Sequence, residues 1–395
     1  MINYPFFTLK RHRILFSKYL LILFVGFNVM SCKKEKNPIQ ITKDTPSFKS
    51  LIKYAKGFDI QDFGTYKKLI IKSPFPNAKN RQEFVLIDSK IKNKGQFKGQ
   101  KIIGIPLKNI VATSTTHIPM LELLDEESKI KGFPHTDYIT SIKTRKLIEK
   151  GLIQDIGNEG ELNTEVLISL NPEAVIGFSM GNNTKMYNII EKNDIPVIYN
   201  GEWLEETPLG RAEWIKFFGV LFNKDKEADS IFSEIEAKYS YAKQIAKESK
   251  KVPSILTGVL FKDKWNLPAG ESFTASLYRD ANTNYLWKES KGQGSLVLSF
   301  ESVYDKAKTA DFWIGSGYFT AYEELAEANN HYMEFDAYKR KRIFTFSKKR
   351  GENGGVLYFE LAPIQPHIVL QDLIKITHPE LLPNYQPYFL EELNE

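Results

Sequence analysis

Apolar residues follow two different spacings along the chain, and the change between them predicts where strands and helices lie. Three segments near the beginning have strand composition, at 66–72, 83–88 and 100–105, and turn-forming residues separate them. These segments predict an antiparallel start to the folded part. From Asn109 onward, short apolar runs alternate with helical patterns. Strands that alternate with helices predict a parallel sheet covered on its faces.

One long helix is predicted in the middle of the chain, from residue 225 to residue 250. Its apolar positions recur at intervals of three and four and form a single stripe, which consists of Ala228, Ile231, Ile235, Tyr239, Ala242 and Ala246. Beyond Pro253 the alternation resumes. A weak internal echo relates 162–179 to 298–317, because in both a helix leads into an apolar strand that ends in glycine. The predicted fold class is therefore α/β, with two Rossmann-like lobes joined by one long backbone helix and a cleft between the lobes.

The same patterns divide the chain into five parts. The predicted parts are a signal peptide at 1–31, a flexible tether at 32–47, a first lobe with its antiparallel strands at 48–222, the linking helix at 223–251 and a second lobe at 252–395. A length of 395 residues with 42% apolar residues suits two or three lobes with substantial cores.

The first 32 residues have the polarity order of a secretory signal. Four basic residues and no acidic residue stand in the first 31, and the apolar run from Tyr19 to Met30 is too short to span a membrane comfortably. Cys32, the only cysteine, follows directly after Ser31. This arrangement resembles a bacterial lipobox, although Met30 replaces the usual small residue. It predicts lipidation of Cys32 and a membrane-anchored lipoprotein of the cell envelope; the alternative is an ordinary cleaved signal.

Charge and motifs argue against two classes of function. The formal net charge is +6, but four basic residues belong to the signal, so the rest of the chain is nearly balanced and offers no basic stripe to nucleic acid. The motifs GxSxG, GxxxxGK(S/T) and HExxH are absent, and Gly292-Gln293-Gly294 lacks the spacing of a dinucleotide-binding loop. Neither an enzyme activity nor a resident cofactor is expected. Aromatic residues form 13% of the chain, which suits a ligand cleft lined by rings.

Six short segments carry a family resemblance. They are NIVATSTT at 109–116, the segment 163–176, DIPVI at 194–198, AGESF at 269–273, SFE at 299–301 and THPEL at 377–381. In this order around one long helix, they resemble the helical-backbone substrate-binding proteins of bacterial ABC importers, which capture ferric siderophores, haem and cobalamin. The resemblance covers about residues 50 to 385. The chain departs from the family in its long N-terminal strand section and at Glu173, where the family usually has Asp.

The resemblance implies a function and a set of partners. The chain is expected to capture an iron chelate, haem or cobalamin in the interlobe cleft and to deliver it to the permease subunits of an ABC import system, as a monomer held at the membrane by its lipid anchor. Glu165 and Glu301 match motif positions where the family carries carboxylates that bind arginines of the permease. The alternative for each glutamate is stabilisation of a helix N-terminus, with Asn163 and Ser299 as the N-caps.

The cleft residues are expected at the carboxyl ends of the strands, where ligands bind in open α/β sheets. The candidate ligand-binding residues are Thr115, Thr116, His117, His135, Tyr138, Phe178, Trp203 and Arg211 in the first lobe and Trp265, Glu271, Ser272, Phe273, Tyr318 and Tyr358 in the second. Four of them are the preferred walls, namely Trp203, Trp265, Phe273 and Tyr318. The alternative is that these rings only seal the core. Arg211 could pair with an anionic ligand or form an ordinary ion pair on a helix.

Two further functions stay open at this stage. Direct binding of a transition-metal ion would need three or four converging ligands, and no histidine pair has close ligand spacing, although His117 and His135 both fall on predicted cleft loops. His117, His135 and Tyr318 are also candidate axial ligands of haem. The other alternative is a surface lipoprotein that serves as a scaffold or adhesion module.

Overall fold

Strands and helices are described here from a computed structural model, which describes residues 50–91, 97–158, 161–181 and 184–395. The predicted signal peptide, Cys32 and the tether lie outside the described residues. No helix in these four ranges is both long enough and apolar enough to cross a membrane.

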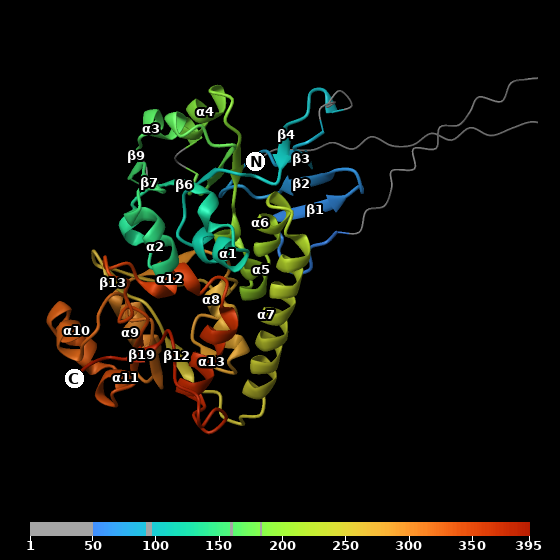
Figure 1. The fold of residues 1–395 in the computed structure, drawn as a ribbon. Helices are drawn as coiled ribbons and strands as arrows, with labels where there is room; N and C mark the ends of the chain where they lie inside the picture. Colours follow the sequence, from blue (N-terminus) through green and yellow to red (C-terminus); the bar gives the residue numbers. More distant parts are fainter. Residues whose placement is uncertain (1–49, 92–96, 159–160, 182–183) are drawn as a thin grey trace, which may run out of the picture. The chain divides into compact units, whose positions relative to one another are not determined.

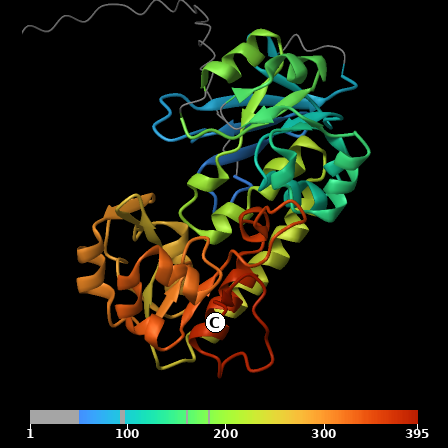
Figure 2. The same cartoon turned by 90° about the vertical axis from the view of Figure 1, so that its left-hand side faces the viewer.

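A four-stranded sheet opens the described chain, in the order β1 (Phe58–Asp62), β2 (Lys67–Ile71), β3 (Gln82–Asp88) and β4 (Ile102–Ile105). The pair β2–β3 is antiparallel, as the sequence predicts, but β3 and β4 run parallel, so the antiparallel prediction is wrong for that pair. The sequence prediction missed β1, which is antiparallel to β2. The alternating buried residues Phe58 and Ile60 turn β1 toward the main core. Figure 2 shows these strands in blue beside the rest of the first lobe.

The first lobe is built on a parallel sheet in the order β11 (Val197–Tyr199), β10 (Ala174–Gly177), β5 (Ile110–Ala112), β6 (Ile130–Phe133) and β7 (Gln154–Asp155). Its strands β5, β10 and β11 are buried throughout, as expected for a sheet covered on both faces. A short hairpin, β8 (Gly157–Asn158) and β9 (Glu161–Leu162), follows β7. Because the chain starts at the central β5 and later crosses back to β10, the loops after these two strands flank the switch point where ligands usually bind.

Helices of the first lobe connect these strands (Figure 1). They are α1 (His117–Leu123), η2 (Glu127–Lys129), η3 (Thr136–Tyr138), α2 (Ile142–Glu149), α3 (Thr164–Ser169), α4 (Thr184–Lys192), η4 (Glu202–Leu204), α5 (Pro208–Ala212) and α6 (Ile215–Leu221). The predicted N-cap Asn163 is confirmed, because its side chain accepts a hydrogen bond from the Val166 amide over 3.1 Å. The sequence prediction omitted α2 and α6.

The long helix is α7 (Asp225–Ala246), which packs against α6 and against α13 (Pro366–Thr377) of the second lobe. The predicted residues 247–250 lie outside it. Its buried stripe consists of Ala228, Phe232, Ile235, Tyr239, Ala242 and Ala246. Phe232 therefore takes the buried place that the sequence prediction gave to Ile231, which is only partly buried.

The second lobe repeats the architecture with a sheet in the order β15 (Asn284–Tyr285), β12 (Ser254–Leu256), β17 (Phe312–Ile314), β18 (Ile343–Thr345) and β19 (Glu391–Glu392), in which only β19 is antiparallel. Its helices are α8 (Phe273–Asp280), α9 (Phe300–Ala307), α10 (Tyr322–Ala328), η5 (Asn330–Glu334), α11 (Asp336–Lys339), α12 (Leu357–Leu361) and α13. The internal echo is confirmed, since α3 leads into β10 as α9 leads into β17.

An additional antiparallel sheet consists of β13 (Val259–Phe261), β14 (Lys264–Pro268) and β16 (Ser295–Leu298). From the sequence, Trp265 is expected in the cleft at the end of a strand, but the residue lies inside β14. Within this strand Trp265 and Leu267 are buried, whereas Lys264 is exposed and Asn266 is only partly buried. The alternation turns Trp265 into the lobe.

Two buried carboxylates fix the segment that leads into β1. Glu213 accepts hydrogen bonds from the backbone amides of Lys53, Tyr54 and Ala55 over 2.8, 2.6 and 2.9 Å. Glu205 accepts hydrogen bonds from the backbone amides of Lys56 and Gly57 at 2.8 to 3.0 Å and from the indole N–H of Trp214 at 3.0 Å. Burial raises the pKa of Glu205, and the hydrogen bonds from its two amides and from the Trp214 indole lower it less. The amides of this segment are thus bonded to the residues that flank α5.

Candidate functional site

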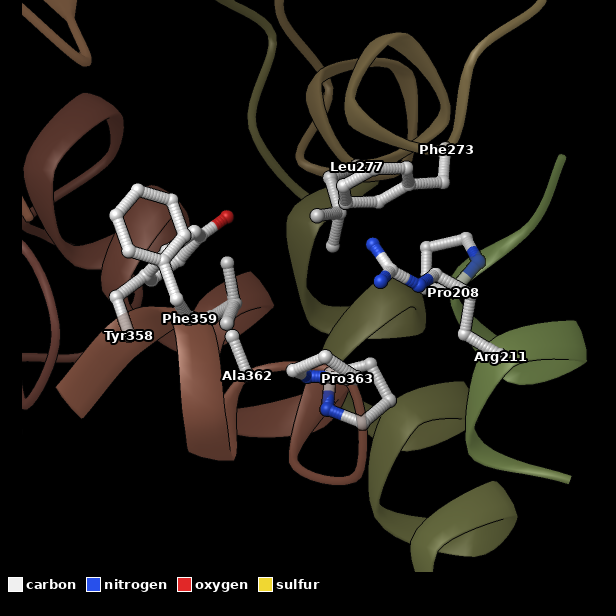
Figure 3. Close-up of a pocket in the computed structure, with 10 residues that line it drawn as sticks. Pro208, Arg211, Phe273, Leu277, Tyr358, Phe359, Ala362 and Pro363 are labelled. Atoms are coloured by element: carbon white, nitrogen blue, oxygen red, sulfur yellow. The ribbon is translucent and has the colours of Figure 1, made fainter. Parts of the chain in front are cut away.

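A cavity of about 110 Å³, which we call the cleft cavity, lies between α5 on the first-lobe side and α8, α12 and α13 of the second lobe. Its lining consists of Pro208, Arg211, Phe273, Leu277, Tyr358, Phe359, Ala362, Pro363, Pro366 and Val369. Figure 3 shows the side chains of Arg211 and Phe273 on one side of this space and those of Tyr358 and Phe359 on the other. The lining is thus apolar and aromatic, with a single charged group.

Arg211 is held in a fixed orientation. Its Nε donates to Glu202 Oε2 over 2.8 Å, and its guanidinium carbon lies 4.2 Å from the centroid of the Phe273 ring. Both members of the ion pair are buried. The ion pair uses only one edge of the guanidinium, and Figure 3 shows its terminal nitrogens directed into the cleft cavity. This arrangement offers an anionic or oxygen-rich ligand a pre-oriented donor.

A second cavity, of about 210 Å³, lies deeper in the second lobe, and we call it the inner cavity. It shares Phe273, Leu277, Tyr358, Phe359 and Val369 with the cleft cavity and extends to Thr257, Pro268, Thr274, Tyr278, Ile314, Gly315, Phe346, Leu373 and Leu390. Tyr358 stacks on Phe346 with ring centroids 4.8 Å apart, and burial raises the pKa of Tyr358 to about 12. The shared rings form the wall between the two cavities.

Three of the predicted ligand residues meet at the cleft cavity, namely Arg211, Phe273 and Tyr358. They come from α5, α8 and α12, which are far apart in the sequence. The sequence reasoning missed Phe359 and Leu277, although each lies within four residues of a predicted contact. The helical spacing of Leu277 after Phe273 was the available signal, because residues four apart share one face of a helix.

Trp265 requires a correction. Its side chain is fully buried, its indole N–H donates to the Thr257 carbonyl over 2.9 Å, and its ring packs against Trp313 and Tyr332 at 5.4 and 5.6 Å. A ring in this position is part of the second-lobe core and forms no wall of the cleft. The alternative that such rings seal the core is therefore right for Trp265.

The start of α1 is also buried more deeply than predicted. His117 is 1% exposed, packs on Phe218 at 5.6 Å, and its Nδ1 has no hydrogen-bond partner among the described residues. Burial lowers the pKa of His117 to about 3, so the ring is neutral. Thr116 is buried with its hydroxyl 3.0 Å from the hydroxyl of Ser114, and Thr115 is half-buried. His117 lines neither the cleft cavity nor the inner cavity.

The remaining first-lobe candidates form two pairs of rings. Phe178 and Trp203 lie 5.7 Å apart, and His135 and Tyr138 lie 5.1 Å apart. None of these four side chains lines the cleft cavity or the inner cavity. The indole N–H of Trp203 is buried and has no partner in the described part of the chain. They stay candidates for a ligand larger than the cleft cavity.

The second-lobe candidates outside the cavities have structural roles or stand at the surface. Ser272 is the N-cap of α8, where its hydroxyl accepts the Ala275 amide over 3.2 Å. The half-exposed Glu271 accepts the Gly292 amide over 2.8 Å, which lowers the pKa of Glu271. Tyr318 is 66% exposed and its ring lies 6.3 Å from that of Phe359.

A polar joint connects the lobes beside the cleft cavity. Glu360 of α12 accepts hydrogen bonds from the amides of Thr140 and Ser141 in the first lobe, over 2.7 and 3.1 Å. Burial raises the pKa of Glu360 to about 7 against the effect of these bonds. A Cβ on Gly355 would lie 2.5 Å from the Tyr138 carbonyl oxygen, so the close approach of the two lobes requires glycine there.

Metal ligands do not converge in the described ranges. These residues contain no group of three or more histidine, cysteine, aspartate or glutamate side chains that could hold an ion. His117 and His135, which the sequence placed on cleft loops, do not form such a group.

Glu165 and Glu301 occupy equivalent positions in the two lobes. Each lies in the first turn of its helix, α3 and α9, and each side chain is exposed. Ser299 is confirmed as the N-cap of α9, since its hydroxyl accepts the Ser302 amide over 3.2 Å. Hydrogen bonds with its own amide and with Ser299 lower the pKa of Glu301. Both glutamates therefore stabilise the N-termini of their helices and still present a carboxylate to solvent.

Comparison with known proteins identifies the class that this fold and cleft define. Residues 110–349 match the periplasmic binding protein family, and because this is more than half of the chain, the chain belongs to that family. An uncharacterized lipoprotein of Methanocaldococcus jannaschii is 25% identical over 305 residues, which cover 74% of this chain and 70% of the relative. The resemblance noted in the sequence is thus confirmed, and the sheet β1–β4 precedes the matched residues.

Solved structures show the same fold. A periplasmic heme-binding protein of Vibrio cholerae has a TM-score of 0.54 and 15% identity and covers 67% of this chain and 98% of its own. A periplasmic solute-binding protein of Staphylococcus epidermidis, described as possibly iron-binding in its own name, has a TM-score of 0.53 and 16% identity and covers 69% of this chain and 99% of its own. The predicted α/β architecture of two lobes joined by a long helix is confirmed.

Proposed function

We propose that this chain is the lipid-tethered, extracytoplasmic binding protein of an ABC importer, and that it captures an iron chelate, haem or a corrinoid between its lobes. The observation that carries the proposal is the cleft cavity, in which Arg211, Phe273 and Tyr358 converge from separate elements. Rings that stack on a flat ligand and one oriented guanidinium suit a bulky, partly apolar ligand with anionic edges. Membership of the periplasmic binding protein family and a lipoprotein relative support the role and the location.

The size of the cleft cavity adds a condition. Ligand sites for molecules of drug size occupy roughly 300–1,000 Å³, whereas the cleft cavity has about 110 Å³. A chelate of the proposed size therefore fits only after the joint at Glu360 separates and α12 moves away from Thr140. Displacement of Phe359, which is 44% exposed, would also bring the inner cavity into the site.

Tryptophan fluorescence titration of the purified protein with haem, cobalamin and a panel of ferric siderophores tests this function. We expect saturable quenching by one ligand with a dissociation constant in the micromolar range or below. Phe273→Ala should weaken that ligand at least tenfold, because it removes both a stacking wall and the ring that supports Arg211.

Phe261→Ala is the matched control, since Phe261 is 65% exposed on the β13–β14 hairpin and lines neither cavity. It should leave the affinity unchanged. Failure of every chelate to quench, or equal effects of both substitutions, would contradict the proposal.

Delivery to the permease is proposed to use Glu165 and Glu301 as one carboxylate from each lobe. The double substitution to alanine should lower the apparent affinity for the cognate transporter at least tenfold in an ATPase assay in lipid nanodiscs, with ligand affinity unchanged. Glu323→Ala is the control, because Glu323 is likewise an exposed first-turn glutamate, in α10. If Glu323→Ala reduces ATPase stimulation equally, the glutamates only stabilise their helices.

A further inference from the structure

The inner cavity adjoins the cleft cavity and shares five lining residues with it. It lies at the carboxyl ends of β12 and β17, where Thr257 and Gly315 follow the strands. Its walls include Leu277 of α8 and Leu373 of α13, two helices that contact each other. The position is the one at which open α/β sheets bind ligands.

Its size and lining select one kind of chemical group. The volume is about 210 Å³, and most of the lining is aliphatic or aromatic. Apolar cavities of about 150 Å³ in proteins stay free of water and bind benzene. The inner cavity therefore has room for a single six-membered ring with a small substituent, and too little room for a second fused ring system.

One end of the cavity is polar. The Tyr278 hydroxyl lies 3.2 Å from Thr257 Oγ1, to which it donates, and 3.4 Å from the Ile314 carbonyl oxygen. Thr257 is 4% exposed, and its hydroxyl has one proton and two lone pairs, so it can bond to a further polar group besides Tyr278. A Cβ on Gly315 would lie 3.2 Å from Thr257 Oγ1, so the absence of a side chain there keeps this end open.

We propose that the inner cavity is a subsite for an oxygen-substituted aryl group of the ligand, with the ring between Leu277 and Leu373 and its oxygen at the hydroxyl of Thr257. The proposal rests on the proposed function in one respect, namely that the remainder of the ligand occupies the cleft cavity. The rings of Phe273, Tyr358 and Phe359, which line both cavities, stand where the two parts of such a ligand would join. An aliphatic chelate without a ring would leave the subsite empty.

Calorimetric titration of the purified protein with phenol and with toluene tests the subsite without any chelate. We expect both probes to bind and phenol to bind more tightly. Thr257→Val, which replaces the hydroxyl with a methyl group of similar shape, should weaken phenol about tenfold and leave toluene unchanged. Leu373→Phe should abolish binding of both probes, because it fills the cavity; circular dichroism checks that this variant folds.

Failure of both probes to bind the unsubstituted protein, or equal loss of phenol and toluene in Thr257→Val, would overturn the subsite. The result of the phenol and toluene titration can be told apart from the result of the chelate titration. Probes that bind while all chelates fail would support the subsite and refute the transport role. Chelates that bind while both probes fail would do the reverse.

Discussion

Glu213→Ala is expected to lower the free energy of unfolding by about 3–5 kcal/mol, the loss typical of removing one partner from a buried ionic network. Glu213 is fully buried and accepts three consecutive backbone amides, and Lys216 Nζ lies 3.1 Å from its Oε1. Alanine would leave these three partly buried amides without their acceptor. Urea denaturation followed by tryptophan fluorescence measures the change, and Glu213→Gln should lose less, because it keeps one acceptor oxygen.

Glu227→Ala is the matched control for this substitution. The Glu227 side chain is 54% exposed in the first turn of α7, and its carboxylate lies 3.7 Å from Lys224 Nζ. Exposed pairs of this kind contribute about 0–1 kcal/mol. A Glu213→Ala protein that unfolds at the same urea concentration as Glu227→Ala would show that water replaces the carboxylate at no cost.

Stability is expected to fall as the pH rises from about 4.5 to about 7, through the titration of Glu360. Burial raises the pKa of Glu360 from its usual 4.5 to about 7, so between these values the folded state holds a proton that the unfolded state has released. The stabilisation by this proton is complete at pH values below the pKa of Glu360 in the unfolded chain. It is lost as the pH rises through the pKa of Glu360 in the folded protein. A difference of this size corresponds to about 3 kcal/mol as an order of magnitude.

The comparison with Glu360→Gln isolates this contribution from those of other carboxylates. Glutamine resembles the protonated acid and cannot titrate, so the stability of the variant relative to the unsubstituted protein should increase from pH 5 to pH 8. Glu360 is 1% exposed, which makes solvent screening of the effect small. Parallel stability curves for the two proteins would contradict the prediction.

The hydrophobic pattern predicted the fold better than it predicted the site, because a repeated pattern reports which face of an element is buried. The alternation of strands and helices gave both parallel sheets, and the spacing of Ala228 to Ala246 gave α7. Trp265 was misplaced although Lys264, Asn266 and Leu267 alternate around it as in a strand. The nearby family motif at 269–273 favoured a cleft position for Trp265 over the buried position that this alternation indicates.

The hydrogen-bond partners of the buried carboxylates could not be predicted from the sequence. Glu360 bonds to amides 219 and 220 residues away, and Glu213 to amides about 160 residues away. A glutamate that accepts hydrogen bonds from backbone amides can pair with almost any residue type, so no pattern in the sequence reveals the pairing. Arg211 was a candidate, but its orientation depends on Glu202 and on Phe273 of another lobe.

The five amides held by Glu205 and Glu213 have a mechanical consequence. The side chains of Lys53 and Tyr54 are also bonded to Glu236 of α7, so the chain leading into β1 is secured to both ends of α5 and to α7. A force applied to the chain on the N-terminal side of Lys53 would act on several of these hydrogen bonds at once. They would bear the force before the pairing of β1 with β2 did. These bonds flank α5, whose Pro208 and Arg211 line the cleft cavity, so a tension large enough to break them would also disturb the cleft.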